Sequence, residues 1–232
     1  LAIAIFKRFD KQLKVTTYIA DGTKVKKGDV IFSVKGKSIS ILTTERLALN
    51  CMQRMSGIAT KTHSLVELCK GTNAKVLDTR KTTPLFRPFE KWAVTIGGGV
   101  NHRYGLYDMV LIKDNHIDYA GGITEAIKST HEYLKKKRKK LSIEIETRNL
   151  NEIKEVLACG GVQRILLDNF KPAQIKNALR IINGKFETEA SGNITEKNIR
   201  KYALTGVDFI SSGSLTHSVK SLDLSLKAVR ND

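Results

Sequence analysis

The sequence has few cysteines and no long hydrophobic run, and each shortage excludes a class of protein. The three cysteines, Cys51, Cys69 and Cys159, are odd in number and include no CxxC pair. This argues against a disulfide framework or a zinc site and suits a reducing cytoplasm. No apolar run approaches the roughly 20 residues that a membrane-spanning helix needs; the opening LAIAIF covers only residues 1–6. We therefore expect a cytoplasmic protein without a membrane partner.

Aromatic residues are also scarce, at 6% of the chain, although 40 Lys and Arg against 23 Asp and Glu give a net charge of +17. So large a basic excess indicates anionic partners. Nucleic-acid binding usually interleaves basic residues with aromatic ones that stack on bases, and no such pattern is present. The densest basic run, KKKRKK at 135–140, ends a predicted helix, where solvated lysines are favoured by the helix dipole. Small polyanionic substrates are therefore favoured over nucleic acid.

What is present, from about residue 75 onward, is an alternation of apolar runs and amphipathic segments. The runs predict strands at 74–78, 108–113, 141–146, 164–168, 185–190 and 207–211. Helical patterns lie between the later runs, in GITEAIKSTHEYLKKK, NLNEIKEVLACG, KPAQIKNALRIING and TEKNIRKYALTG. The last four strands recur roughly every 22 residues, the length of one βα unit. Such units predict a parallel sheet, open or closed, and the lack of a dinucleotide fingerprint after the first strand favours a barrel.

Several predicted strands end in a polar residue, at the edge where a βα barrel carries its chemistry. These residues are Lys113, Glu146, Asp168, Ser191 and Ser211. In LSIEIE the strand alternation places Glu144 and Glu146 on one face and the isoleucines on the other. Two acids inside a barrel are costly unless cations or ligands pair with them. The alternative is an edge strand with its acids in water.

Residues 1–73 predict a different unit. Asp-Gly and Lys-Gly turns divide the segment 15–42 into short strands, and a long amphipathic helix, TTERLALNCMQRMSGIATKTHSLVELCKG, follows. Ser56-Gly57 either interrupts this helix or marks a close approach of another segment. We expect a β-rich N-terminal domain with its linking helix at 1–73, a catalytic domain at 74–214, and a C-terminal helix at 215–230 that packs back on the first. The chain starts with Leu in an apolar pattern, which favours a missing upstream segment.

Eight motifs resemble the quinolinate phosphoribosyltransferase family, in the family's order, from about Ala20 to Leu226. They are ERLALNCMQRMSGIAT, DTRKTTP, GGGVNHR, LIKDNH, the IEIE acid pair, LLDNF, EASGNI and SGSLTHS. The resemblance implies transfer of phosphoribose from phosphoribosyl pyrophosphate to quinolinate with decarboxylation, and a requirement for Mg²⁺. It implies an α/β fold, in which an α+β N-terminal domain packs on an incomplete, seven-stranded α/β barrel. It also implies at least a homodimer whose active sites are shared, with an arginine from an upstream segment reaching the neighbouring site.

The resemblance also implies roles for particular residues. Those expected to bind quinolinate or complete the positive site around both substrates are Arg46, Arg80, Lys81, His102, Arg103 and Lys113. Glu146 and Asp168, with Lys81, are the expected catalytic residues, and both acids are potential Mg²⁺ ligands. Glu144 is a nearby supporting acid, and His116 is expected to be structural.

Two short loops are expected to bind phosphate, because each follows a strand and opens a helix whose backbone N–H groups face an anion. Their residues are Ser191, Gly192, Asn193, Ser212, Gly213 and Ser214. Two alternatives stay open. One is a related phosphoribosyltransferase that uses nicotinate or a relative associated with molybdenum transport, although the full set of cations favours a dicarboxylate. The other is a basic nucleic-acid-binding barrel without activity.

Overall fold

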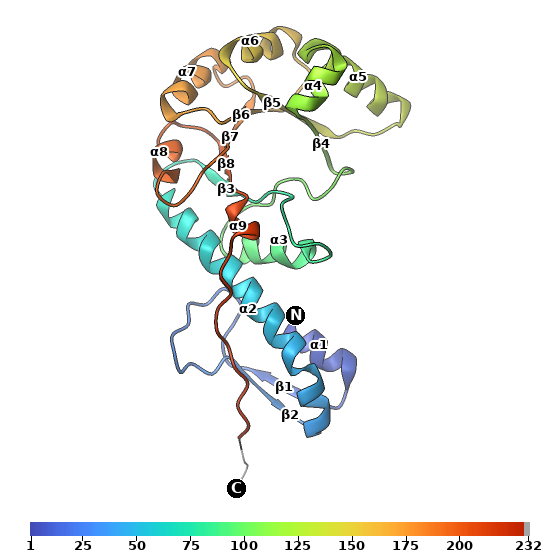
Figure 1. The fold of residues 1–232 in the computed structure, drawn as a ribbon, viewed down its shortest axis with the longest axis vertical. Coiled ribbons are helices and arrows are strands. Elements are labelled where there is room, and N and C mark those ends of the chain that lie inside the picture. Colours follow the sequence, from blue (N-terminus) through green and yellow to red (C-terminus); the bar gives the residue numbers. More distant parts are fainter. Residues whose placement is uncertain (230–232) are drawn as a thin grey trace.

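The computed structural model describes residues 1–229. One long helix, α2 (Ser38–Leu68), links a small N-terminal unit to a parallel sheet surrounded by helices (Figure 1). The small unit contains α1 (Ala2–Phe9) and an antiparallel pair of strands, β1 (Lys14–Thr17) and β2 (Phe32–Lys35). Its core is formed by Phe6, Leu13 and Ala48, so α2 supplies one wall of it.

The N-terminal unit is less β-rich than the sequence predicts. Only two strands of four residues each are present among the described residues. The run SISIL at 38–42, which we expected to be a strand, is instead the first turn of α2. A short apolar run does not distinguish a strand from a helix, and extending an existing helix costs far less than nucleating a separate element.

α2 continues without a break through Ser56 and Gly57. These two residues therefore do not interrupt the helix; as the alternative interpretation predicts, they mark the close approach of another segment. A Cβ at Gly57 would collide with the carbonyl of Lys220, which shows that the C-terminal segment lies directly on the helix. Gln53 fixes this segment from both sides: its carbonyl accepts from Leu222 N at 3.1 Å and its side chain donates to Leu224 O at 2.9 Å.

The prediction of a C-terminal helix at 215–230 is wrong for most of this range. α9 covers only Ser214–His217, and the described chain to residue 229 has no further regular element; residue 230 lies outside the described residues. This segment does pack back on the N-terminal part of the molecule, as expected, but as an extended chain along α2 (Figure 1). Its backbone groups bond to Gln53 rather than to one another, which replaces helical hydrogen bonds.

The main sheet has six parallel strands in the order β3-β8-β7-β6-β5-β4. Their bounds are β3 (Lys75–Leu77), β4 (Met109–Ile112), β5 (Ser142–Thr147), β6 (Arg164–Asp168), β7 (Glu187–Ser191) and β8 (Phe209–Ser211). All six expected strands are confirmed, and so is the parallel sheet. In the ribbon they form an incomplete ring, open between β3 and β4 (Figure 1).

The implied seventh strand is reduced, within residues 1–229, to a single parallel bridge between Val100 and Leu77. Val100 N donates to Val76 O at 2.8 Å, so Val100 occupies the next position beyond β3. The following residues leave the sheet, because His102 N donates to the carboxylate of Asp78 at 2.9 Å instead of to a neighbouring strand.

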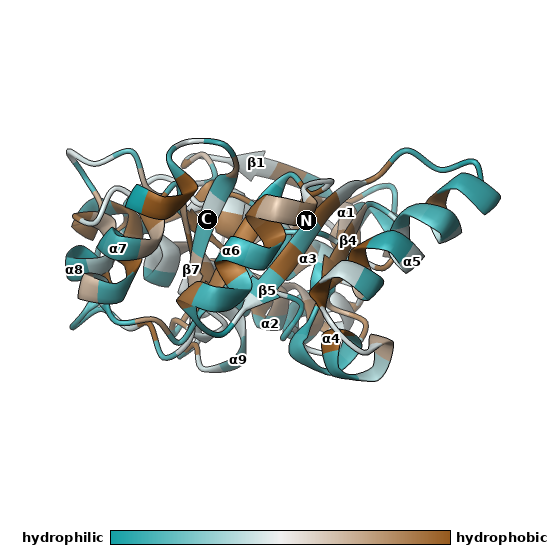
Figure 2. Ribbon diagram, turned by 90° about the horizontal axis from the view of Figure 1, so that it is seen from above, coloured by the Kyte–Doolittle hydropathy of each residue, from teal (hydrophilic) through white to brown (hydrophobic). Residues whose placement is uncertain are grey.

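Helices cover the outside of the sheet. They are α3 (Arg87–Ile96), α4 (Asp114–Ala120), α5 (Ile123–Lys136), α6 (Leu150–Cys159), α7 (Pro172–Ile182) and α8 (Ile199–Ala203). The last four were expected from the sequence, whereas α3 and α4 were not. Figure 2 shows α5 projecting from the body with a mostly hydrophilic surface. Among the described residues, no helix has the length and apolar character that a bilayer crossing demands.

Strand alternation separates an apolar outer layer from a polar interior. Ile143 and Ile145 belong to the buried cluster beneath the helices, as do Ile165 and Leu167. Glu144 and Glu146 therefore face the barrel interior, as we expected. Glu144 is fully buried, so the alternative of an edge strand with its acids in water is wrong.

Candidate active site

The barrel interior contains charged side chains where barrels usually have branched aliphatic ones. Glu144, Glu189 and Arg164 come from the three central strands β5, β7 and β6, and the first two are buried. Burying charges is tolerated only when they are paired and hydrogen-bonded. These groups are paired, as described below, so the interior is built for charge.

The expected catalytic acids lie at the carboxyl ends of β5 and β6. Glu146 and Asp168 are both partly buried. Burial, together with the nearby Asp168 and Asp114 carboxylates, raises the pKa of Glu146 to about 7, while Lys113 opposes the rise. Burial also raises the pKa of Asp168, although its side chain accepts a 2.6 Å hydrogen bond from Asn169 and feels Lys81 and Lys113. Glu146, Asp168, Lys81 and Lys113 thus share one electrostatic environment.

The expected cations His102 and Arg103 follow Val100 and are both buried, at 8% exposure each. Arg103 donates to Met109 O at 3.4 Å. Burial and the nearby guanidinium of Arg80 lower the pKa of Arg103, so the two arginines lie close together. Within residues 1–229 neither forms a salt bridge to an acid. Two arginines that interact and form no salt bridge are suited to bind an anion, because their forked donors match carboxylate geometry.

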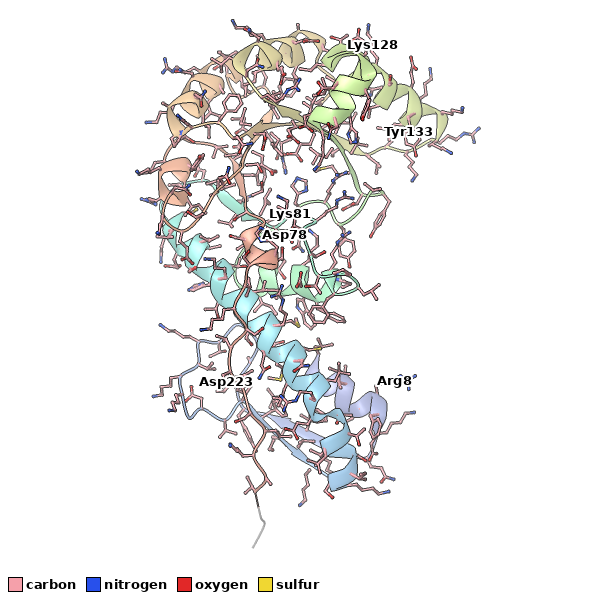
Figure 3. All side chains as sticks on the ribbon, in the orientation of Figure 1. Arg8, Asp78, Lys81, Lys128, Tyr133 and Asp223 are labelled. Carbon is pink, nitrogen blue, oxygen red and sulfur yellow. The ribbon has the colours of Figure 1, made fainter. Side chains whose placement is uncertain are left out.

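Arg80 and Lys81 lie on a loop that several side chains hold in place. Arg87 donates to Arg80 O at 3.4 Å and to Tyr104 O at 3.0 Å, which links this loop to the one that carries Arg103. Thr216 donates to Lys81 O at 2.8 Å. Figure 3 shows Asp78 and Lys81 together at the end of β3, in the middle of the molecule.

A buried ion pair anchors the same loop to α2. Glu90 is fully buried and lies 2.8 Å from Arg54. The Glu90 carboxylate also accepts from Thr83 N at 3.1 Å and from the Thr83 hydroxyl at 2.9 Å. Arg54 donates in addition to the carbonyls of Thr216 and Val219. The Arg54–Glu90 pair therefore joins α2, the C-terminal segment and the loop that carries Lys81.

The two expected phosphate loops differ from each other. Ser212 and Gly213 do precede a helix, α9, but this helix begins at Ser214 and has only four residues. Ser212 Oγ lies 2.8 Å from Ser214 Oγ. Gly213 lies against the Lys81 side chain, where a Cβ would come 3.0 Å from Cδ.

The first loop does not open a helix, which corrects our expectation. Ser191 ends β7, but the next helix, α8, begins only at Ile199. Gly192 has a φ of 98°, and a Cβ there would collide with Asn169, so a side chain is excluded on both grounds. Asn193 adopts a φ of 52°, and its side chain donates to Asn169 at 3.3 Å. This loop therefore packs against the residue that follows Asp168.

Arg46 is the one expected site residue that the fold keeps away from the barrel. It is exposed on the part of α2 next to the N-terminal unit. Thr62, which meets Gly99 at the barrel, lies sixteen residues further along α2. At 1.5 Å per residue, roughly 24 Å of helix separate them. His116 has the expected structural role, since its Nδ1 accepts from Lys113 N at 3.1 Å.

Sequence reasoning missed several charged residues that the fold buries or partly buries, among them the following. Glu189 lies on β7 with the same alternation that identified Glu144, so the pattern KFETEA could have revealed it. Arg164 stands at the start of one short apolar run, and Asp78 directly follows another. Exposed residues also occupy such positions, so this pattern does not single the two residues out. Lys91 lies in α3 at 1% exposure, and its Nζ donates to Asp78 at 2.5 Å and to His102 O at 2.9 Å. No signal in the sequence distinguishes it from a surface lysine.

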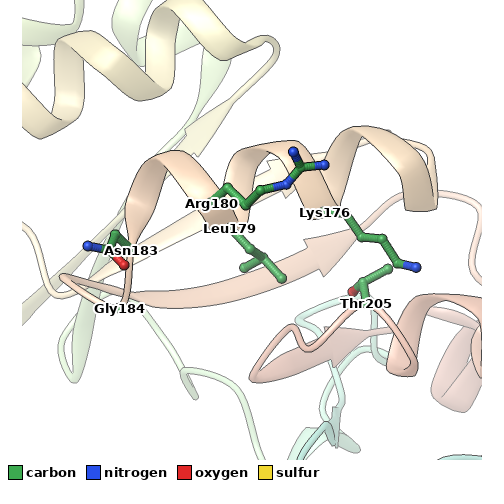
Figure 4. Close-up of a pocket in the computed structure, with 6 residues that line it drawn as sticks. All are labelled: Lys176, Leu179, Arg180, Asn183, Gly184 and Thr205. Carbon is green, nitrogen blue, oxygen red and sulfur yellow. The ribbon is translucent and has the colours of Figure 1, made fainter.

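A shallow hollow of roughly 500 Å³ lies elsewhere, on the outer side of the sheet (Figure 4). It is formed by α7 and the turn before β8 and is lined by Lys176, Leu179, Arg180, Asn183, Gly184 and Thr205. Since α7 covers the helix side of the sheet, this hollow is separate from the barrel interior.

Comparison with known proteins shows which family the chain belongs to. Residues 1–56 match the family of quinolinate phosphoribosyl transferase N-terminal domains, and residues 58–227 match that of the C-terminal domains. A chloroplastic nicotinate-nucleotide pyrophosphorylase from Arabidopsis thaliana is 51% identical over 98% of this chain and 69% of its own length. A mitochondrial quinolinate phosphoribosyltransferase from Nicotiana glauca is 48% identical over 98% of this chain and 68% of its own. These plant names give no support to the expected cytoplasmic location.

Solved structures give the same result. The crystal structure of NadC from Streptococcus pyogenes matches with a TM-score of 0.92 at 41% identity, over 98% of this chain and 79% of that one. The nicotinate-nucleotide pyrophosphorylase from Francisella tularensis matches with a TM-score of 0.90 at 43% identity, over 97% and 78%. This chain therefore belongs to the quinolinate phosphoribosyltransferase family.

Proposed function

We propose that this protein transfers phosphoribose from phosphoribosyl pyrophosphate to quinolinate and releases carbon dioxide, giving nicotinate mononucleotide and pyrophosphate for NAD synthesis. The observation that carries the proposal is that Arg80 and Arg103 interact with each other, in a member of this family, and that neither forms a salt bridge among the described residues. Both substrates are anions, which accounts for cations gathered at one end of a barrel.

Quinolinate carries two adjacent carboxylates. Arg80 and Arg103 are suited to hold them, because a guanidinium can donate two parallel hydrogen bonds to one carboxylate. His102 and Lys113 add further positive charge. A pyridine acid with one carboxylate would leave part of this set without a partner in a partly buried site, which favours quinolinate over nicotinate.

Glu146 and Asp168 are suited to the ribose. When pyrophosphate leaves, positive charge develops on the ribose carbon and ring oxygen, and carboxylates fixed nearby stabilise it. The raised pKa of Glu146 shows that its negative charge lacks full compensation in the protein alone. A developing positive charge supplies that compensation in the transition state.

The same pair of acids fits Mg²⁺, which usually binds through one or two carboxylates together with substrate phosphates. A divalent cation would stabilise these two partly buried carboxylates and the nearby Asp114, because it relieves the repulsion that helps to raise the pKa of Glu146. When bound, Mg²⁺ would neutralise charge on the pyrophosphate. Lys81 and the backbone N–H groups of 191–193 and 212–214 would receive the remaining phosphate oxygens.

Decarboxylation needs little further chemistry from the protein. Ribosylation makes the ring nitrogen cationic, and this stabilises the carbanion left when the neighbouring carboxylate departs. The protein then contributes position and charge. The sequence shows no motif of a nucleophile or of a Schiff-base lysine, so we propose no covalent intermediate.

The working unit is at least a homodimer with shared sites, and Arg46 is the residue that suggests it. Within one chain Arg46 is separated from the barrel, as described above. It shares an exposed face of α2 with Ile39, Leu42 and Leu47, which are 71%, 65% and 58% exposed. An apolar helix face of this kind marks an interface, and a second copy that covers it would receive Arg46 at its own barrel.

Mixing two inactive variants tests the shared site. Arg46→Ala and Asp168→Asn chains each lack one contribution, and a mixed dimer has one site with both residues intact. Random pairing restores roughly a quarter of wild-type activity. If subunit exchange is demonstrated by mass spectrometry and no activity returns, each chain uses its own Arg46 or none.

The reaction itself is tested with quinolinate labelled at its 2-carboxylate. Release of labelled carbon dioxide should require phosphoribosyl pyrophosphate and Mg²⁺, and nicotinate should not form the mononucleotide. Equal turnover of nicotinate would contradict the proposal. Strong retention on nucleic acid with a steep salt dependence, and no carbon dioxide release, would favour the nucleic-acid-binding alternative instead.

A further inference from the structure

The ring of His102 lies against two buried carboxylates inside the barrel. Its Nε2 is 2.8 Å from Glu144 and 3.4 Å from Glu189. Both acids are fully or almost fully buried, at 0% and 1% exposure. They come from β5 and β7, on either side of β6, so the fold directs two negative charges at a single nitrogen atom.

A second cation completes this group from β6. Arg164 is 3.4 Å from Glu189 and 2.9 Å from Glu187, which is 55% exposed. The Arg164 guanidinium also stacks on Phe209, 3.9 Å from the ring centroid, and this fixes its position. Glu189 therefore lies between two cationic groups, His102 on one side and Arg164 on the other.

When His102 is protonated, the carboxyl groups of Glu144 and Glu189 face one imidazolium and one guanidinium, and Arg164 is shared with Glu187. Burial and the nearby Glu189 carboxylate raise the pKa of Glu144 to about 7. A metal ion is the other way to satisfy such a cluster, since the ligand atoms of His102, Glu144 and Glu189 lie within 4.8 Å of one another. A divalent metal would require a neutral imidazole, and its charge together with that of Arg164 would exceed the charge of the two carboxylates. A proton on His102 instead gives both acids a cationic partner without a further ligand.

The backbone of His102 is fixed as well. Its N–H donates to Asp78 at 2.9 Å and its carbonyl accepts from Lys91 at 2.9 Å, and these two buried residues form an ion pair. The charged groups around the ring and backbone are Asp78 from the end of β3, Lys91 from α3, Arg103 from the same loop, Glu144 from β5, Arg164 from β6 and Glu189 from β7.

We propose that Glu189, held by Arg164, is a positioning residue that keeps the His102 ring protonated and directs its Nδ1–H at the anionic substrate. Among the described residues Nδ1 has no hydrogen-bond partner, whereas Nε2 is occupied by the two acids. Both nitrogens of an imidazolium are donors, so Nδ1 remains for a carboxylate. This inference rests on the proposed function only in taking that carboxylate to be quinolinate's.

The titration of His102 agrees with this geometry. Burial alone would lower its pKa, but the hydrogen bonds that the ring donates to Glu144 and Glu189, and the charges of these acids, outweigh burial and raise the pKa to about 9. Its folded pKa lies above the ordinary value of 6.5, so the ring stays charged through neutral pH. His102 is then a permanent cation of the site rather than a group that exchanges a proton during the reaction.

The test is an NMR titration of the histidine side chains with and without Glu189→Gln. The chain has only five histidines, and His102→Gln identifies the signal of interest. We expect Glu189→Gln to lower the His102 midpoint by about one unit or more, since one charged partner is lost. Glu187→Gln is the matched control: it removes a carboxylate from the same strand that also pairs with Arg164 but is exposed, and it should leave the midpoint unchanged. Glu189→Asp keeps the charge and should lower the midpoint less than Gln.

Binding gives an independent measurement. Glu189→Gln should weaken quinolinate binding about threefold or more at pH 8.5 and little at pH 6, where His102 is protonated in both proteins. An equal loss at both pH values, with an unchanged midpoint, would mean that Glu189 only supports the fold and would overturn the inference. A stoichiometric metal ion in the wild type that is absent from Glu189→Gln would overturn it too. Unchanged quinolinate affinity in His102→Gln would instead contradict the proposed role of His102, whatever the midpoint.

Discussion

Replacing Glu146 with Gln should make the protein more stable and less active, and the gain in stability should depend on pH. Burial raises the pKa of Glu146 from 4.5 to about 7. The folded chain therefore binds a proton at this site more readily than the unfolded chain does. The free energy of unfolding falls as pH rises from 4.5 to 7, and the full penalty is present above pH 7. Gln cannot ionise, so it escapes this penalty.

The size of the effect follows from the shift. A rise of about 2.5 units corresponds to about 3.4 kcal/mol at 1.36 kcal/mol per unit. Glu146 is only partly buried, and solvent screens part of its repulsion with Asp168. We therefore expect Glu146→Gln to raise the free energy of unfolding by about 2 kcal/mol at pH 8 and by little at pH 5. Activity should fall at both pH values, because the charge that stabilises the ribose is lost.

Urea unfolding at pH 5 and pH 8, followed by circular dichroism, measures the difference between wild type and variant. Glu132→Gln is the control, since Glu132 is exposed on α5 and should give the same result at both pH values. A gain at pH 8 that is no larger than at pH 5 would refute the reasoning. Added Mg²⁺ should reduce the gain, because a cation at the wild-type site relieves the same repulsion.

The remaining predictions concern binding, turnover and the buried pairs. Arg103→Ala should mainly weaken quinolinate binding, seen as a raised Kd with a smaller change in kcat, whereas equal losses would argue against a ground-state contact. Asp168→Asn should lower kcat by roughly 10²-fold or more, and full turnover would exclude its proposed role. Lys91→Met should lower the free energy of unfolding in urea by about 3–5 kcal/mol, because Asp78 would remain buried without its cation. Adding Asp78→Asn should recover part of this loss, and an additive loss in the double variant would contradict the pairing. Glu90→Gln should cost about 2–3 kcal/mol and also slow turnover, since it releases Thr83, and unchanged turnover would separate this pair from the active-site loop.

The sheet was predictable because its strands and crossover helices repeat at close to constant spacing. Each expected strand matches an observed one to within two residues, since buried parallel strands read as apolar runs bounded by polar ones. The C-terminal segment was not predictable in the same way. SLTHSVKSLDLSLKAV has the pattern of a helix, but its backbone bonds to Gln53 of α2, and such a long-range partner leaves no local signal.

The site was predictable to the extent that its residues lie in motifs. Arg80, His102 and Arg103 stand out by resemblance, and the structure brings the two arginines together. The residues that hold them were harder to find. Lys91 looks like any helical lysine until the fold buries it against Asp78, because burial depends on contacts between distant segments.

The pairing of β3 with β8 has a consequence for the order in which the molecule folds. Lys75 lies beside Phe209, which follows it 134 positions later in the chain, whereas β4 to β7 each pair with the next strand in sequence. During synthesis the units from β4 to β7 can form one after another, but β3 waits for β8. α2 waits longer still, because the segment that covers Gly57 follows β8. β3 and the part of α2 around Gly57 are therefore completed last, and their apolar surface stays exposed until the segment that follows β8 has left the ribosome.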